Sequence, residues 1–155
     1  MKPYIPSSEL VFSHNDLCYN NIIRDDRSLR IIDYEYAGFN YRGQDLATYI
    51  SESMFTYDHP SYPYYSCNPD LEMSDDVAAA FLQEYARVSD IDYQELHDEV
   101  EMCRVSAHYM GALWCASMFN PNAPEDCFDL LGYSKCRLDE YRRRKAIYDK
   151  NRSNF

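Results

Sequence analysis

Long apolar runs and positive charge are both scarce in this sequence. No apolar stretch of its 155 residues is long enough for a transmembrane helix, and the opening MKPYIPSS lacks the apolar core of a signal peptide. The chain carries 15 basic against 26 acidic residues, a net charge of −11, so its surface repels nucleic acids and anionic membranes. We therefore expect neither nucleic acid binding nor membrane insertion, whereas a small cation would not be repelled.

Metal-binding cysteine motifs are also missing. The six cysteines form no CxxC pair and no Cys/His cluster with zinc spacing. Because no secretion signal is seen, we expect free thiols in a reducing cytoplasm. The even number of cysteines would also allow disulfides, but nothing else in the sequence favours them.

The organisation of the chain changes near residue 44. Before that point, short β-rich runs flank the turn-like segment RDDRS, which predicts a hairpin. After it, Leu46, Ile50 and Met54 lie on one helix face, Ser74 can cap the next helix, and Asp92 and Glu95 have capping-box spacing before an apolar stripe from Leu96 to Trp114. The expected helices cover about residues 44–55, 75–88, 92–114 and 129–150, with a proline-rich loop at 57–70. We therefore expect an α+β fold in which a small β unit precedes a mainly helical body.

Two carboxylates follow short apolar runs near the start of the chain. His14-Asn15-Asp16 is followed four residues later by Asn21, and Asp33 ends the next apolar run, which is the spacing of a kinase catalytic loop and its metal-binding aspartate. Asp16 would accept the proton of an acceptor hydroxyl, while Asn21 and Asp33 would offer oxygen ligands to Mg²⁺. Because Asp and Asn also favour turns and strand ends for local reasons, these residues alone leave a structural coincidence open.

Four longer segments, in the same order as here, resemble the choline/ethanolamine kinase family. They are HNDLCYNNI, IDYEYAGFNYRGQDLA, ALW and FDLLGYSKCRLDEY, and the resemblance extends from about Val11 to Tyr141. It implies the C-terminal lobe of a eukaryotic-protein-kinase-like fold over residues 1–155, with ATP as co-substrate and Mg²⁺ as cofactor. It also implies phosphorylation of the hydroxyl of choline or ethanolamine.

The resemblance keeps the three roles described above and adds supporting ones. Glu35 resembles an additional acidic residue near the metals, and a solvated loop glutamate is the alternative. His14 would brace the catalytic loop. Asp45 would hydrogen-bond backbone amides of that loop or cap its own helix.

The acceptor site has a physical argument of its own. A quaternary ammonium donates no hydrogen bond and is bound by aromatic faces and a nearby carboxylate. Glu52 lies seven residues after Asp45, so both share one helix face. The resemblance makes Glu52 the carboxylate that meets the ammonium and makes Tyr57, Trp114 and Tyr133 the ring walls. The alternatives are a solvated Glu52 and a core Trp114.

The chain departs from the family at two positions. Gly111-Ala112-Leu113-Trp114 stands where Trp-Gly-Leu-Trp is common, and Ser53 stands where a tryptophan is frequent. We expect choline as the acceptor, in the first step of phosphatidylcholine synthesis. The thinner cage leaves ethanolamine or dual specificity open. An aminoglycoside-type phosphotransferase and a non-catalytic regulatory fragment are further alternatives.

Glycine and lysine are too few for an ATP phosphate site. The four glycines form no phosphate-covering loop, and none of the four lysines lies on a strand before the catalytic loop. Kinases need both features to hold ATP. We therefore expect the ATP-binding lobe to lie outside these residues, as in a fragment, a truncated gene product or a split enzyme, and the chain alone to be inactive. The apolar face left exposed would favour self-association, so a homodimer is an expected partner.

Overall fold

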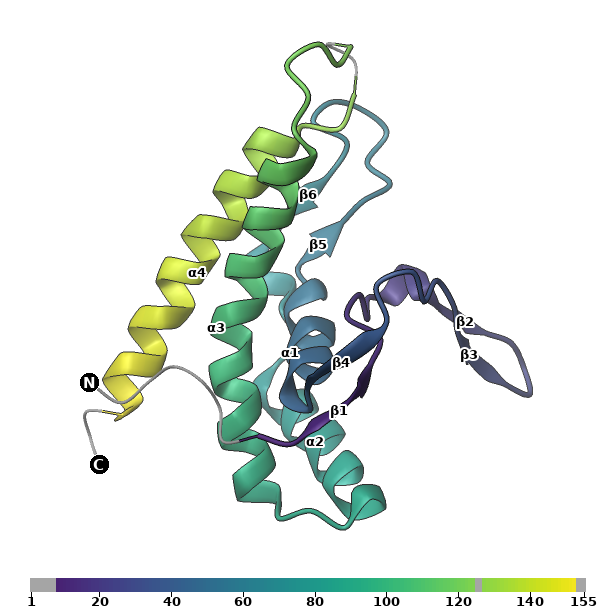
Figure 1. Cartoon of the computed structure of the whole chain (residues 1–155), viewed down its shortest axis with the longest axis vertical. Coiled ribbons are helices and arrows are strands. Elements are labelled where there is room, and N and C mark those ends of the chain that lie inside the picture. Colours follow the sequence, from purple (N-terminus) through teal and green to yellow (C-terminus); the bar gives the residue numbers. More distant parts are fainter. Residues whose placement is uncertain (1–7, 125–126, 153–155) are drawn as a thin grey trace. The chain divides into compact units, whose positions relative to one another are not determined.

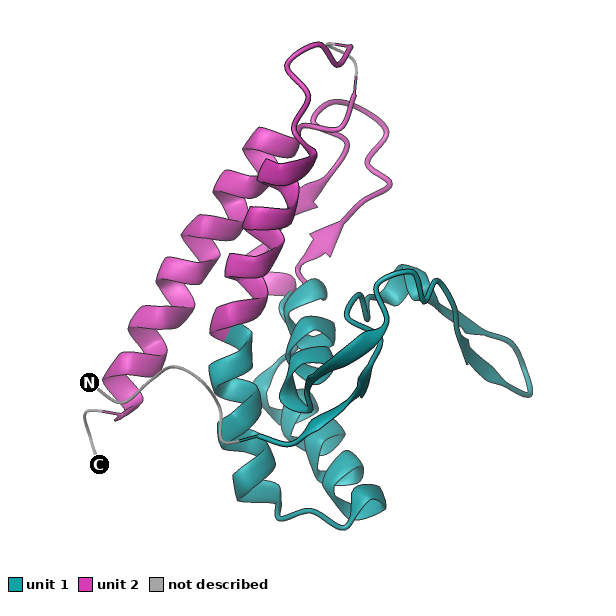
Figure 2. Cartoon of the chain, in the orientation of Figure 1, with its two compact units in different colours: residues 1–53, 72–104 teal, residues 54–71, 105–155 magenta. Residues whose placement is uncertain are grey.

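The chain divides into two compact units, which Figure 2 colours separately. The structure, a computed structural model, describes residues 8–124 and 127–152. The first unit comprises Met1–Ser53 and Glu72–Arg104, and the second comprises Met54–Leu71 and Val105–Phe155. Each unit has its own hydrophobic core.

Two antiparallel strand pairs lie in the first unit (Figure 1). β1 (Leu10–Ser13) pairs with β4 (Gly38–Tyr41), and β2 (Ile22–Arg24) pairs with β3 (Leu29–Ile31). A single 3-10 turn, η1 (Tyr19–Asn21), leads into β2. The β2–β3 hairpin confirms the prediction from the RDDRS turn. β4 was not predicted, because the four-residue segment GFNY begins with glycine and carries little strand signal by itself.

Three helices enclose the core of the first unit. They are α1 (Gly43–Glu52), α2 (Asp75–Ser89) and the first part of α3 (Tyr93–Met118). Each contributes three buried apolar side chains, and the nine together are Leu46, Ala47, Ile50, Ala78, Leu82, Ala86, Leu96, Val100 and Cys103. Helices were predicted over all three segments.

The predicted helix caps are confirmed only in part. Ser74 precedes α2 as expected, but its side chain makes no capping hydrogen bond. At the start of α3, the Glu95 N–H donates to the Asp92 carboxylate at 2.9 Å. The carboxylate of Glu95, which would complete a capping box, instead accepts a hydrogen bond from Arg42.

In the second unit, the end of α3 runs alongside α4 (Leu130–Arg152), as Figure 1 shows. The Ser134 hydroxyl on α4 donates to the carbonyl of Ala112 on α3 at 2.9 Å. Residues 57–70, which were predicted as a proline-rich loop, contain β6 (Ser66–Cys67). This strand pairs with β5 (Phe55–Thr56) and is followed by the short turn η2 (Pro69–Leu71). Met54 was expected on the face of α1, but that helix ends at Glu52 and Met54 is buried in the core of the second unit.

The apolar stripe predicted along α3 is confirmed only in its first part. Leu96, Val100 and Cys103 are at most 2% exposed, whereas Met110 and Trp114 are 57% and 45% exposed. In the second unit the buried positions on α3 are Val105, Ala107, His108, Ala112 and Cys115, of which only Ala107 lies on the predicted stripe. The buried face therefore advances by about one residue along the helix, which an unbroken apolar repeat does not reveal.

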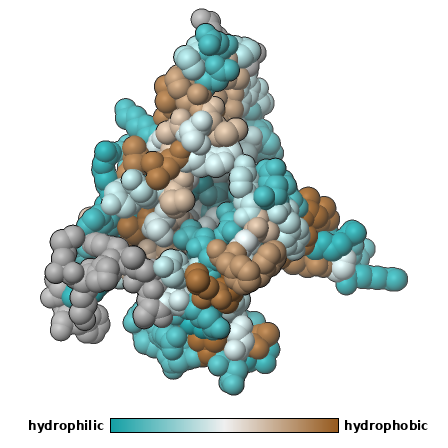
Figure 3. All heavy atoms as spheres, viewed as in Figure 1, coloured by the Kyte–Doolittle hydropathy of each residue, from teal (hydrophilic) through white to brown (hydrophobic). Residues whose placement is uncertain are grey.

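Exposed hydrophobic side chains gather on the β1–β4 pair. Leu10, Phe12 and Phe39 are all exposed, and the rings of Phe12 and Phe39 meet edge to face at 6.3 Å. Figure 3, viewed as in Figure 1, shows hydrophobic residues, in brown, at the surface of this face of the molecule. Within the described ranges, no helix combines the length and apolar character needed to cross a bilayer.

Candidate functional site

Left-handed backbone explains the polar residues that end the two apolar runs. Asn15 and Asp33 both have φ of 66°. Among residues other than glycine, Asn and Asp enter this region most readily. The chain therefore turns sharply after β1 and again after β3, and each turn begins a segment that carries candidate site residues.

Asp45 holds the loop that follows β1. The backbone N–H groups of His14 and Asn15 donate to its two carboxylate oxygens at 2.6 and 2.8 Å. Such charge-assisted bonds are among the stronger hydrogen bonds in proteins. Asp45 also lies in the first turn of α1, where the helix dipole favours a negative charge. This is the loop contact expected of Asp45.

His14 links the same loop to the segment before Asp33. Its Nε2 lies 2.8 Å from the Ile32 carbonyl oxygen, and its Nδ1 lies 3.3 Å from the N–H of Asp16. Both bonds form together only when Nε2 carries the hydrogen. The buried imidazole also packs against Tyr34, with ring centroids 4.8 Å apart. His14 therefore braces the loop, and its ring nitrogens are used in doing so.

Asn15 makes a second link, which was not predicted. Its side-chain amide donates to the Tyr36 carbonyl at 2.9 Å and accepts from the Asn40 side chain at 2.8 Å. The contact ties the loop to the turn between Asp33 and β4. Its only sequence signal is the middle position of His14-Asn15-Asp16.

Asp16 and Asn21 lie in direct contact. The side-chain N–H₂ of Asn21 donates to both the backbone carbonyl and the carboxylate of Asp16, at 2.9 and 3.0 Å. Burial raises the pKa of Asp16, the Asn21 hydrogen bond opposes the rise, and the negative charges of Glu52 and Asp33 add to it. Asp16, Asp33 and Glu52 are thus close enough for their charges to interact.

The oxygen donors here suit Mg²⁺, which prefers carboxylate and amide oxygens. Asn21 directs its N–H₂ toward Asp16, so its carbonyl oxygen is the atom available as a ligand. A cation beside Asp33 would reduce the repulsion that the negative charges of Glu52 and Asp33 exert on the Asp16 carboxylate. In the part of the chain that is described, no three His, Cys, Asp or Glu side chains are arranged to hold a metal alone. A magnesium ion would therefore need ligands from phosphate and water as well. Glu35 is exposed in a turn two residues beyond Asp33.

Glu52 is the last residue of α1 and is only 7% exposed. A solvated helix face, the alternative reading of its sequence position, is therefore excluded in this structure. The helix dipole disfavours a negative charge at this end of a helix, and the charge of Glu52 reaches Asp16. A buried carboxylate in this position can attract a cation.

The second unit brings two of the predicted ring residues together. The hydroxyl oxygens of Tyr57 and Tyr133 lie 2.5 Å apart, and their ring centroids 5.8 Å apart. Tyr133 is a buried core residue at 4% exposed, whereas Trp114 lies at the surface of α3. Arg137 was not predicted as part of this group; its guanidinium donates to the Tyr133 hydroxyl at 2.8 Å and lies 3.9 Å from the ring centre of Phe55. Its signal was its position one helical turn after Tyr133.

Known proteins similar to this chain are choline and ethanolamine kinases. A probable choline kinase 3 of Arabidopsis thaliana is 34% identical over 145 residues, which cover 88% of this chain and 40% of the relative. An ethanolamine kinase of Drosophila melanogaster is 32% identical over 146 residues, covering 91% of this chain and 27% of the relative. The chain spans between 27% and 40% of the length of the curated relatives it matches.

Solved structures give the same result. The crystal structure of a choline kinase from Cryptosporidium parvum Iowa II matches with a TM-score of 0.81 at 26% identity, covering 96% of this chain and 42% of that one. A Plasmodium vivax ethanolamine kinase matches with a TM-score of 0.68 at 25% identity, covering 87% and 34%. A sequence model of one family, described as Choline/ethanolamine kinase, matches residues 4–142. The chain therefore belongs to the choline/ethanolamine kinase family.

Proposed function

We propose that residues 1–155 are the C-terminal lobe of a kinase-like enzyme that transfers the terminal phosphoryl group of ATP to the hydroxyl of choline. Ethanolamine is the alternative acceptor. One observation carries the proposal: the loop held by Asp45 places Asp16 against Asn21, within charge reach of Asp33 and Glu52. A cytoplasmic location and a homodimer are part of the same proposal.

Asp16 is the catalytic base in this proposal. Phosphoryl transfer depends mainly on position and on charge stabilisation, so the base must be held still beside the acceptor hydroxyl. Asn21 binds one carboxylate oxygen of Asp16, and we assign the acceptor proton to the other. Partial burial, which raises the pKa of Asp16, makes the ionised carboxylate a better proton acceptor. His14 and Asp45 keep the loop in this geometry.

Asn21 and Asp33 would hold Mg²⁺, with Glu35 as the additional acidic residue near it. The metal, when bound, neutralises charge on the ATP phosphates. Asp33 presents its carboxylate from left-handed backbone directly after the β2–β3 hairpin. Asn21 presents its side chain from the turn directly before that hairpin. The short hairpin therefore sets the spacing between the two ligands.

The acceptor would be recognised by its positive charge. By the family resemblance, Glu52 supplies the carboxylate for the ammonium, and Tyr57 and Trp114 supply the ring faces. Tyr133 contributes by holding the hydroxyl of Tyr57. Choline, which has no ammonium N–H, needs ring faces most. Ethanolamine can donate hydrogen bonds as well, so it depends on them less.

The proposal is tested by acceptor choice. The chain is joined to the ATP-binding lobe of a similar kinase, and phosphate transfer from radiolabelled ATP is measured with choline, ethanolamine and an aminoglycoside. We expect transfer to the two amino alcohols, with choline preferred. Transfer to the aminoglycoside alone would overturn the substrate class. Absence of transfer to all three, in a fusion that binds ATP, would favour a non-catalytic role.

Asp33→Asn in this fusion is expected to raise the magnesium concentration for half-maximal activity by at least about tenfold. Asparagine also tolerates left-handed backbone, so the substitution removes the charge and leaves the turn intact. The measurement is a magnesium titration of activity, with thermal unfolding as the control. Asp33→Gly keeps the backbone freedom and removes the ligand, so it should behave similarly. A loss of thermal stability with no change in magnesium requirement would make Asp33 a structural residue.

Removing the acceptor-binding groups is expected to raise the KM for choline more than the KM for ATP. Each ring in Tyr57→Ala or Trp114→Ala should cost about 1–2 kcal/mol, which is roughly a fivefold to thirtyfold change. Glu52→Gln should act in the same direction. Tyr109→Ala, which also removes an exposed ring from α3, is the matched control and should change neither constant. Equal affinity for choline and its neutral carbon isostere would contradict recognition by charge.

A further inference from the structure

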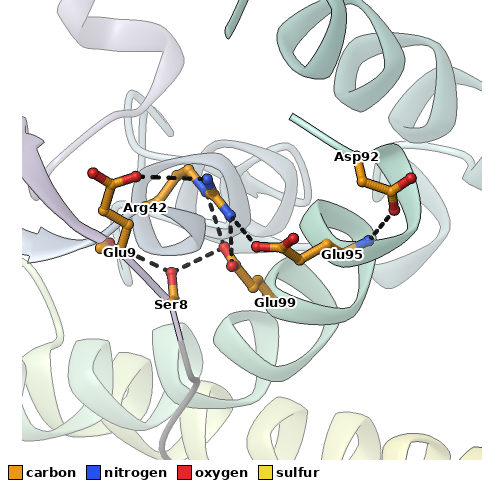
Figure 4. Close-up of polar contacts among 6 residues, drawn as sticks. All are labelled: Ser8, Glu9, Arg42, Asp92, Glu95 and Glu99. Carbon is orange, nitrogen blue, oxygen red and sulfur yellow. Dashed lines mark hydrogen bonds and ion pairs between the residues drawn. The ribbon is translucent and has the colours of Figure 1, made fainter. Parts of the chain in front are cut away.

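A buried arginine joins three segments of the first unit outside the candidate site (Figure 4). Arg42 donates to both carboxylate oxygens of Glu99 on α3, from Nε to Oε2 at 3.1 Å and from Nη2 to Oε1 at 2.6 Å. It also donates to Glu95 at 3.1 Å. Arg42 and Glu99 are each 6% exposed. The two-pronged contact therefore fixes both the distance and the direction of the Arg42 side chain.

The same cluster holds the chain just before β1. The backbone N–H of Arg42 donates to the Glu9 carbonyl at 3.0 Å, and the Ser8 hydroxyl donates to Glu99 at 2.9 Å. The Glu9 carboxylate also approaches the guanidinium, as Figure 4 shows. β1 begins one residue after Glu9, and its last residue directly precedes His14. The cluster thus anchors the strand that leads into the candidate catalytic loop.

Arg42 also lies at the start of α1. It occupies the N-cap position of α1, three residues before Asp45. At the next position, a Cβ atom on Gly43 would lie only 3.2 Å from the Cys103 sulfur and from the Glu99 carbonyl carbon. The start of α1 is therefore pressed against α3 with little room to shift. Asp45 projects from this same first turn.

We propose that Arg42 is a positioning residue for catalysis, which aligns the amides of His14 and Asn15 with Asp45 by fixing the chain before β1 and the start of α1 on the same carboxylate of α3, that of Glu99. This inference rests on the proposed function. A buried ion pair adds little net stability over apolar packing of similar volume. The planar guanidinium of Arg42 does, however, fix the direction of the hydrogen bonds that it donates. The cluster's contribution is therefore to loop geometry rather than to the free energy of unfolding.

That difference supplies the test. Arg42→Met/Glu99→Leu replaces the pair by apolar side chains of similar length in the 155-residue chain, and NMR follows the amides of His14 and Asn15. We expect the thermal midpoint to change by only a few degrees, while both amides shift and exchange with solvent at least about tenfold faster relative to amides in α3. Arg42→Lys keeps the charge without the fork and should give smaller changes in the same two amides.

The matched control is Arg87→Met/Glu84→Leu, an exposed ion pair on α2, which should leave both amides unchanged. The proposal is overturned if His14 and Asn15 keep their shifts and exchange rates, or if all amides accelerate together. Where the double variant does not fold, unchanged amides in Arg42→Lys overturn it equally.

The catalytic part is measured in the fusion used for the acceptor test. Arg42→Lys should lower kcat by at least about tenfold, because small misplacements of catalytic groups are costly, and leave the KM for choline nearly unchanged. Displaced amides with a normal kcat would overturn the catalytic role. An inactive parent fusion would instead count against the proposed function, and the amide measurements on the chain alone would still decide whether Arg42 positions the loop.

Discussion

Asp16→Asn is expected to lower the rate of phosphoryl transfer at least about a hundredfold, the usual contribution of a positioned general base. The substitution removes the proton acceptor but preserves shape. An asparagine oxygen at this position can still accept the hydrogen bond from Asn21, which now reaches the Asp16 carboxylate at 3.0 Å. We therefore expect the KM for ATP and the thermal midpoint to change little.

The measurement is kcat in the fusion with an ATP-binding lobe. Asp26→Asn is the matched control, because Asp26 is an exposed aspartate in the turn between β2 and β3. It should retain full activity. Near-normal turnover by Asp16→Asn would mean that another group accepts the proton, and the assignment of Asp16 would be wrong.

The parts of the site that the sequence predicts well are those built from local segments. The β2–β3 hairpin follows from turn composition, and Asn21 and Asp33 flank it directly. The contact between Asp45 and the loop amides spans about 30 residues. It was expected from the family resemblance, and no local pattern encodes it. Glu52 shows the value of helical periodicity, because its two-turn spacing from Asp45 indicated the same face.

Long-range choices of partner could not be predicted. Arg42 finds Glu99 across 57 positions, and the sequence shows only an arginine before a glycine and two glutamates four residues apart. Glu95 is the clearest case: its N–H makes the capping bond that its spacing from Asp92 predicts, but its carboxylate, which would complete a capping box, binds Arg42 instead. An ion pair with a buried guanidinium competes successfully with a solvent-exposed cap because the buried charge needs its partners more.

The ring residues show the limit of sequence as a guide. The family resemblance suggested Tyr133 as one wall of an aromatic cage, yet Tyr133 is buried in the core of its unit. Its hydroxyl binds Arg137, a cation of the chain itself. Trp114 was equally suited to a core by its place on the apolar stripe, and it is exposed. Aromatic side chains serve cores and ligand sites by the same contacts, so only their burial separates the two uses.

The second large effect concerns the 155-residue polypeptide by itself, which we expect to fold and yet to phosphorylate neither choline nor ethanolamine. Both units have their own buried cores, so far-ultraviolet circular dichroism should show a helical protein that unfolds on heating. ATP would be held only through a metal at Asn21 and Asp33, because residues 1–155 include no glycine-rich phosphate loop. A displacement of about 1 Å can already cost a hundredfold in rate, and an unrestrained phosphate moves further than that.

The decisive experiment supplies an ATP-binding lobe as a separate protein. Radiolabelled phosphate transfer to choline is measured for the chain alone, for a separately produced ATP-binding lobe of a similar kinase, and for the two mixed. We expect activity only in the mixture, and none in a mixture that contains the Asp16→Asn chain. The exposed side chains of Leu10, Phe12 and Phe39 favour association, since burying them removes apolar surface from water. Robust turnover by the chain alone would show that its own residues can hold ATP in line, and the assignment of residues 1–155 to one lobe would then be wrong.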